Sequence, residues 1–208
     1  MDVEDKVQWV FNAENPQELT ERYDLWAKNY EQDLEENFAY VGPQTAVEVF
    51  VKYVLKDAKI LDAGAGTGLV GQLLASQGYA HLEALDMSTG MLGEAQKKNT
   101  YQAFHQATLG QPLDFPSAAF DALISVGTFT VGHAPSSAFD ELIRITQPGG
   151  YIIFTISNPL YEKDDFPNKL AALEASGRWE LIEVTEPFRC HLKHEPDLYL
   201  KVWVYRVC

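Results

Sequence analysis

The chain is poor in cysteine and in basic residues, and both shortages exclude classes of function. Cys190 and Cys208 are the only cysteines. They could pair, but we expect two free thiols in a cytoplasmic protein. No Cys/His cluster has the spacing of a zinc site, so we expect no metal. Lys and Arg number 16 against 30 Asp and Glu, which gives a net charge of −14. This acidity argues against nucleic acid as the main partner, because phosphate binding needs a basic patch.

Long apolar runs are absent as well. No stretch reaches the length of a membrane span. The first residues, MDVEDKVQW, carry acids where a signal peptide would carry positive charge. We therefore expect no membrane contact. The chain has 208 residues, 46% of them hydrophobic, which is enough for the core of one α/β domain.

The most informative stretch is KILDAGAGTGLVG, residues 59–71. A short apolar run ends in Asp62, glycines follow at Gly64, Gly66 and Gly68, and a helical segment comes next. Strand, glycine loop and helix in this order are typical of a nucleotide-binding turn. Glycine permits positive φ and lets a ligand approach the backbone where a Cβ would clash.

The glycine spacing separates two classes of cofactor. A dinucleotide-binding G-x-G-x-x-G pattern can be placed only on Gly66, Gly68 and Gly71, and it then begins too late after the strand. The pattern D-x-G-x-G-x-G directly after an apolar strand instead resembles motif I of the class I methyltransferases that use S-adenosylmethionine.

A second strand, HLEALD, ends in Asp86, which is 18 residues after Gly68 (86 − 68). An acid at this strand tip can accept both ribose hydroxyls of an adenosine. The following helix begins with Ser88 or Thr89 as its cap. The alternative for Asp86 is an ordinary solvated acid at a strand end.

The chain divides into two parts. Residues 1–56 show no strand pattern, and 57–208 alternate between strands and helices, as in a parallel sheet with crossover helices. Asn15-Pro16-Gln17-Glu18 predicts a helix start, and a second helix is expected at 44–56. The last two strands, near 179–188 and 198–207, have no room for a helix between them and must be antiparallel.

The resemblance extends over the whole chain. Tyr23-Asp24-x-Trp26-Ala27-x-x-Tyr30, Phe120-Asp121-Ala122 and the Pro148-Gly149-Gly150 turn are similar to the Williams-Beuren syndrome region methyltransferase-like branch. The resemblance implies an α/β, Rossmann-like, seven-stranded and mostly parallel sheet with a C-terminal antiparallel hairpin and helices on both faces. It also implies S-adenosyl-L-methionine as cofactor, a class I methyltransferase core at 57–208 and a helical lid at 1–56. Thr108 stands where many relatives carry Asp.

The resemblance assigns roles along the chain. We expect the cofactor to be held by Tyr23, Trp26, Tyr30, Asp62, Gly64, Ala65, Gly66, Gly68, Asp86, Met87, Thr108, Leu109 and Val126. Asp62 would orient the loop through its backbone N–H groups, and Tyr23, Trp26 and Tyr30 would form the lid. An ordinary core stripe is the alternative for these three aromatic residues.

His133, in the loop after a strand expected at 120–127, is the best candidate for a general base, with a surface or capping histidine as the alternative. Asn158 and Tyr161 could contact the substrate, or simply form a turn. The sequence predicts a methyltransferase acting on a small molecule. A protein that binds the cofactor without turnover and a nicotinamide oxidoreductase are the competing functions. The acceptor atom, a protein substrate and the oligomeric state stay open.

Overall fold

A computed structural model of the protein describes residues 3–163, 165–193 and 198–208. Its strands are β1 (Ile60–Ala63), β2 (Leu82–Asp86), β3 (Ala103–Gln106), β4 (Phe120–Phe129), β5 (Thr146–Ser157), β6 (Trp179–Val184), β7 (Phe188–Arg189) and β8 (Tyr199–Val207). They form one sheet in the order β3-β2-β1-β4-β5-β8-β6, and β7 pairs with β8. The first five strands are parallel, whereas β8 runs antiparallel to β5, β6 and β7.

This sheet confirms the predicted fold class. The two C-terminal strands are antiparallel, as the missing crossover helix required. The difference is the short β7, which makes the sheet eight-stranded. It lies where the sequence predicted a continuous strand over 179–188, because the chain leaves β6 after Val184 and pairs again with β8 at Phe188.

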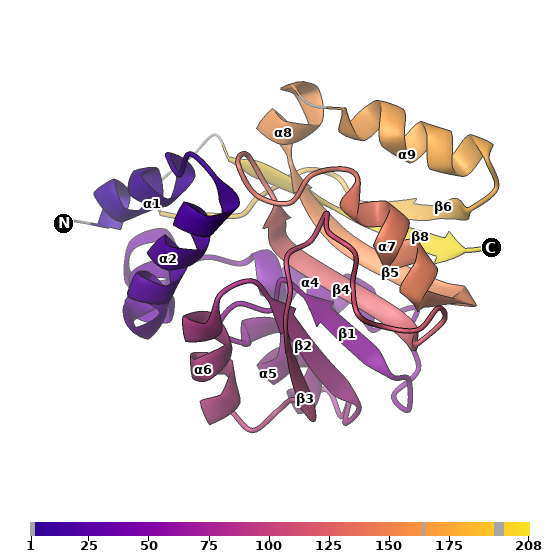
Figure 1. The fold of residues 1–208 in the computed structure, drawn as a ribbon, viewed down its shortest axis with the longest axis horizontal. Coiled ribbons are helices and arrows are strands. Elements are labelled where there is room, and N and C mark those ends of the chain that lie inside the picture. The colour runs from indigo at the N-terminus through magenta and orange to yellow at the C-terminus, as the bar shows by residue number, and fades with distance from the viewer. Residues whose placement is uncertain (1–2, 164, 194–197) are drawn as a thin grey trace.

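Helices cover both faces of the sheet (Figure 1). They are α4 (Gly42–Phe50), α5 (Leu69–Ser76) and α6 (Thr89–Lys97) on one face, and α7 (Ala138–Ile145), α8 (Asn158–Lys163) and α9 (Phe166–Ala175) on the other. The strands between them are buried on both sides, as apolar parallel strands require. No helix in the described residues is long and apolar enough to cross a membrane.

The N-terminal part contains more elements than the two expected helices. They are α1 (Val3–Phe11), α2 (Pro16–Trp26), the 3₁₀ turn η1 (Ala27–Asn29), α3 (Tyr30–Asp33) and the π turn η2 (Leu34–Phe38), followed by α4. The α2 start is as predicted, because the Asn15 side chain accepts from the Glu18 N–H at 2.9 Å. The apolar spacing gave no sign that η1 and η2 would interrupt the helix. Figure 1 shows α1 and α2 together at one end of the molecule, opposite α9 and β6.

A separate hydrophobic cluster holds the N-terminal helices together. Its buried members are Val7, Val10, Leu19, Trp26, Leu34 and Phe38. Met87, which follows β2, packs against this cluster. The N-terminal segment is therefore attached to the sheet beside the end of β2.

Candidate cofactor-binding site

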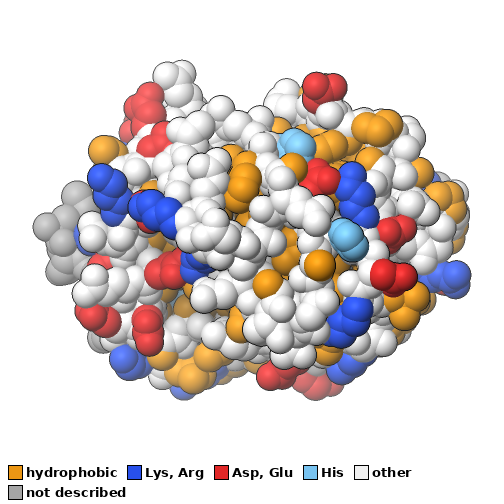
Figure 2. Space-filling view, turned by 90° about the horizontal axis from the view of Figure 1, so that it is seen from below, with side chains coloured by type: hydrophobic (Ala, Val, Ile, Leu, Met, Phe, Trp, Pro, Cys, Tyr) orange, Lys and Arg blue, Asp and Glu red, His pale blue; other side chains and the backbone are white. Residues whose placement is uncertain are grey.

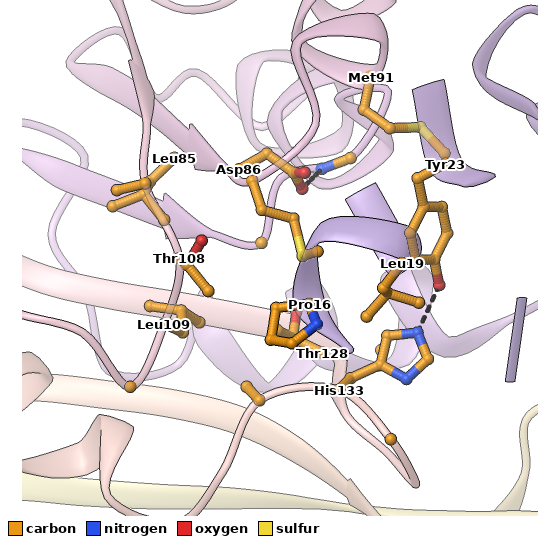
Figure 3. Close-up of a pocket in the computed structure, with 18 of the residues that line it drawn as sticks. Pro16, Leu19, Tyr23, Leu85, Asp86, Met91, Thr108, Leu109, Thr128 and His133 are labelled. Atoms are coloured by element: carbon orange, nitrogen blue, oxygen red, sulfur yellow. Dashed lines mark hydrogen bonds between the residues drawn. The ribbon is translucent and has the colours of Figure 1, made fainter. Parts of the chain in front are cut away.

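The main cavity opens at the carboxyl ends of β1, β2 and β4, where ligands bind in sheets of this type. It holds about 980 Å³ of space, part of it open to solvent. Figure 3 shows Leu85, Thr108 and Leu109 on one side of it and Leu19, Tyr23 and His133 on the other. Of the residues proposed from the sequence, ten line it: Tyr23, Tyr30, Gly64, Gly66, Asp86, Met87, Thr108, Leu109, Val126 and His133.

The glycine loop after β1 forms one wall of the cavity. The N–H groups of Gly64 and Ala65 donate to the Leu85 carbonyl oxygen at 2.7 and 2.9 Å, which fixes the loop against β2. Gly64 packs closely, because a Cβ there would lie 2.1 Å from Thr128 Oγ1. Gly66 differs: its φ is +54° and a Cβ would meet no atom within 4 Å. Gly66 therefore leaves a space that a ligand can fill.

Asp86 lies beside that space at the tip of β2. Its Oδ2 accepts from the Gly66 N–H at 2.8 Å, and its Oδ1 accepts from the Ser88 N–H at 2.9 Å. Burial raises the pKa of Asp86, and these backbone N–H groups oppose the rise. Each carboxylate oxygen has a second lone pair, so Asp86 can accept further hydrogen bonds from a ligand.

Asp62 has a different environment from the one predicted. It is buried beneath the loop, where its Oδ2 accepts from the Tyr101 hydroxyl at 2.5 Å. The Tyr101 oxygen in turn accepts from the Gly71 N–H at 3.0 Å. The carboxylate thus reaches the backbone of α5 through Tyr101 rather than bonding the loop directly. Burial raises the pKa of Asp62 to about 7.

Ala65, Gly68 and Trp26 do not line the main cavity. Ala65 is itself part of the loop, and its side chain is buried in the core on one face of the sheet. Gly68 begins α5 with φ +87°, and a Cβ there would lie 3.1 Å from Ala95 Cβ, so this glycine lets the loop pack on α6. Trp26 is buried in the N-terminal cluster, and its Nε1–H donates to Asp33 at 2.6 Å. These three residues therefore support the packing of the loop and of the N-terminal segment and do not face the main cavity.

Tyr23 and His133 meet at one side of the cavity, as the dashed line in Figure 3 shows. The Tyr23 hydroxyl lies 2.7 Å from His133 Nε2, and His133 Nδ1 lies 2.9 Å from the Val131 carbonyl oxygen. A carbonyl oxygen only accepts, so Nδ1 carries the proton and Nε2 accepts from Tyr23. Burial lowers the pKa of His133 and raises that of Tyr23. Both groups are therefore neutral at pH 7.

The aromatic residues of the N-terminal segment were expected either to form a lid over the cofactor or to form an ordinary core stripe. The structure places some of them in each environment. Trp26 and Leu34 are buried in the N-terminal cluster, and Leu19 is buried there but also lines the main cavity. Tyr23 and Tyr30 are half-buried and reach the main cavity. The stretch from α2 to η2 therefore supplies both buried core residues and part of a cavity wall.

Asp24 was missed as a functional candidate. Its Oδ1 accepts from Ser88 Oγ at 2.5 Å and from the Gly90 N–H at 2.7 Å. It thereby ties α2 to the start of α6, directly after Asp86 and Met87. Its place in the Tyr-Asp-x-Trp-Ala run is the sequence signal that could have identified it. The prediction from this run used only the spacing of the aromatic residues.

Other candidates lie away from the cavity. Asn158 and Tyr161, offered as substrate contacts, belong to α8, and the Tyr161 ring stacks on Trp203 at 5.3 Å. Across the described part of the chain, no group of three His, Cys, Asp or Glu side chains could hold a metal ion.

The strand order, the glycine loop and the acid at the tip of β2 together define an α/β protein of the class I methyltransferase type. Comparison with known proteins agrees. The family described as "Methyltransferase domain" matches residues 61–154. "Methyltransferase-like protein 27" of Homo sapiens is 38% identical over 165 residues, which are 76% of this chain and 66% of that protein. The chain thus spans slightly less than two thirds of this relative.

Solved structures share the fold at low identity. A TehB-like SAM-dependent methyltransferase from Corynebacterium glutamicum has a TM-score of 0.65 at 20% identity, covering 93% of this chain and all of the other. The [4+2]-cyclase SpnF has a TM-score of 0.70 at 16% identity, covering 94% of this chain and 97% of the other. By sequence over residues 61–154 and by fold, the chain is similar to the class I S-adenosylmethionine-dependent methyltransferases, whose cofactor is S-adenosyl-L-methionine.

The residues present fit this cofactor. Gly66 leaves space for a ligand against the backbone, and Asp86 offers free lone pairs to ribose hydroxyls. Met87, Thr108 and Leu109 line the cavity beside them and would offer the adenine apolar surface and one hydroxyl.

Replacing Asp86 by Ala tests the ribose contact. We expect S-adenosylhomocysteine to bind about 10- to 100-fold more weakly, because hydrogen bonds to a charged group are each worth about 1.5–3 kcal/mol. Calorimetry measures the affinity. Asp86→Asn keeps the size of the side chain and one acceptor oxygen, so its affinity should lie between those of the parent and Asp86→Ala. Unchanged affinity in Asp86→Ala, with an intact thermal transition, would place the ribose elsewhere.

Proposed function

We propose that this protein transfers a methyl group from S-adenosylmethionine to a small-molecule acceptor. The observation that carries the proposal is the open space at Gly66 beside Asp86, in a cavity whose opposite side holds the Tyr23–His133 pair. Bound S-adenosylmethionine would supply an activated methyl group on a sulfonium. The protein's own contribution is to orient the acceptor, exclude water and accept a proton.

The Tyr23–His133 pair gives the proton a route. His133 Nε2 is already occupied by the Tyr23 hydroxyl, so His133 acts through Tyr23 rather than on the acceptor directly. An O–H or N–H acceptor that donates to the Tyr23 oxygen can lose its proton while Tyr23 passes its own to Nε2. Because the pKa of His133 is lowered, Nε2 carries no proton at neutral pH and can accept the proton from Tyr23.

Turnover should depend on this relay. We expect Tyr23→Phe to lower kcat at least about 100-fold, as loss of general base catalysis does, while S-adenosylhomocysteine affinity changes little. In the parent, kcat/KM should fall only when the pH drops below the ordinary histidine pKa, because that of His133 is lowered. Rates are measured with the acceptor that the extract experiment at the end of this subsection identifies, for the parent, Tyr23→Phe and His133→Gln. Parent-like rates in both variants would rule out the relay.

The N-terminal segment is proposed as a lid over the bound cofactor. Tyr23 and Tyr30 reach the cavity, and Asp24 joins α2 to the segment after Asp86. We expect residues 19–38 to gain protection in hydrogen exchange when S-adenosylhomocysteine is added, because closing lids commonly enclose reactants. The C-terminal hairpin, β6 with β8, is the internal control. Equal protection in both states would make α2 a fixed part of the core.

A binding protein without methyl transfer is the second candidate function. The likeness to a [4+2]-cyclase favours keeping it, because that structure shows that this fold also serves another chemistry.

One experiment separates these functions. The full chain is incubated with S-adenosylmethionine and cell extract, and each fraction is searched for a mass gain of one methylene. A methylated metabolite supports the proposal. A mass gain in RNA or protein alone would overturn the small-molecule assignment. Absence of any methylated product, despite S-adenosylhomocysteine binding, would favour the non-catalytic function.

A further inference from the structure

A second cavity adjoins the main one. The two cavities share Tyr23, Tyr30 and Gly127 as lining residues. We call it the aromatic cavity, and its remaining lining residues are Val7, Val10, Phe11, Trp26, Leu34, Tyr40, Thr130, Cys190, His191, Leu198 and Leu200. Because Gly127 lies within β4, this cavity reaches the strand whose end borders the main cavity.

We propose that the aromatic cavity is the acceptor site and that it selects an uncharged, mainly apolar molecule with one polar nucleophilic group. This inference rests on the proposed methyl transfer. Among the described residues that line it, there is neither an acid nor a Lys or Arg. A carboxylate or phosphate would lose its water there without gaining a counter-charge, which is costly.

A cationic acceptor is disfavoured for a separate reason. The nearby carboxylate of Asp33 is already used, since it accepts from Lys6 Nζ and from Trp26 Nε1, each at 2.6 Å. The rings also pack on one another. Tyr23 stacks on Trp26 at 6.4 Å, and Trp26 meets Tyr30 edge to face at 4.9 Å. They form a wall of apolar surface rather than a cage of open faces around a cation.

Two hydroxyls remain to hold one polar group. Within the part of the chain that the structure describes, no hydrogen bond involves the hydroxyl of Tyr30 or of Tyr40. Burial raises the pKa of both, so they stay neutral donors. Tyr40 also lies close to Gly127, because a Cβ on this glycine would be 2.9 Å from the Tyr40 oxygen. The free hydroxyls thus stand near the residues shared by the two cavities.

The test uses three ligands that differ mainly in charge: 2-phenylethanol, 2-phenylethylammonium and 3-phenylpropanoate. Each is titrated by calorimetry into the full chain saturated with S-adenosylhomocysteine. We expect the neutral alcohol to bind at least 10-fold more tightly than either ion. Tighter binding of the amine or of the acid, or no binding of any of the three, overturns the proposal. Failure of S-adenosylhomocysteine itself to bind would instead contradict the proposed function.

Two variants locate the binding. Thr130→Phe should fill the aromatic cavity and weaken 2-phenylethanol at least 10-fold without changing S-adenosylhomocysteine affinity, because Thr130 does not line the main cavity. The double variant Tyr30→Phe with Tyr40→Phe keeps the shape and removes both hydroxyls, and should weaken the alcohol about 5- to 10-fold. Parent-like binding of the alcohol in Thr130→Phe would place the acceptor elsewhere and overturn the assignment.

Discussion

Gly66→Val is expected to lower S-adenosylhomocysteine affinity at least about 100-fold while the protein stays folded. A Cβ at Gly66 meets no protein atom within 4 Å, so valine occupies space that is open to a ligand rather than clashing with the core. The cost to folding is limited to the positive φ of +54°, about 1–2 kcal/mol for a non-glycine residue. The loss of affinity follows because the side chain fills the ligand's place.

Gly177 offers a matched control for that experiment. Its φ is +66°, and a Cβ there also meets nothing within 4 Å, but it follows α9 and does not line the main cavity. Gly177→Val should lose similar stability and keep full affinity. Calorimetry and thermal unfolding on both variants separate backbone strain from blocking of the site. Equal affinity in the two variants would show that the loop does not contact the cofactor.

Asp62→Asn is expected to remove a large pH dependence of stability. The pKa of Asp62 is raised from 3.8 to about 7 by burial. At a pH between these two pKa values, the folded state keeps a proton that the unfolded state has lost. The contribution of Asp62 to the free energy of unfolding is therefore fully present below pH 3.8 and is lost as the pH rises through 7. The difference of about 3 pKa units corresponds to about 4 kcal/mol, as an order of magnitude.

The measurement is the free energy of unfolding in urea at intervals from pH 4 to pH 8, for the parent and for Asp62→Asn. The side-chain amide in Asp62→Asn is neutral throughout, and its oxygen can still accept a hydrogen bond from Tyr101. The stability of the variant relative to the parent should therefore increase steadily as the pH rises over this range. Tyr101→Phe is the companion variant, because removing a hydrogen bond that lowers the pKa should shift the loss of stability to higher pH. A constant difference between the parent and Asp62→Asn across the range would mean that Asp62 is ionised in the folded state.

The cofactor side of the site was predictable because its residues follow strands directly. Gly66 and Asp86 each stand at the carboxyl end of a short apolar strand, and parallel strands bring such ends to one edge. The antiparallel end of the sheet was predictable for a comparable reason, because no residues were left for a crossover helix.

Side-chain contacts between residues far apart in the sequence were not predictable in this way. Tyr23 and His133 are 110 residues apart, and Tyr101 and Asp62 are 39 apart. No local pattern links the partners, and the Tyr101 contact changed the role expected of Asp62. The breaks at η1 and η2 also escaped the sequence, because the apolar spacing stays helical through both.

Titration of the full chain with S-adenosylhomocysteine in a calorimeter, with NADH in a parallel titration, tests the central claim most directly. We expect saturable binding of one S-adenosylhomocysteine per chain and no binding of NADH. Binding of NADH, or no heat of binding from S-adenosylhomocysteine, would contradict the assignment of the main cavity.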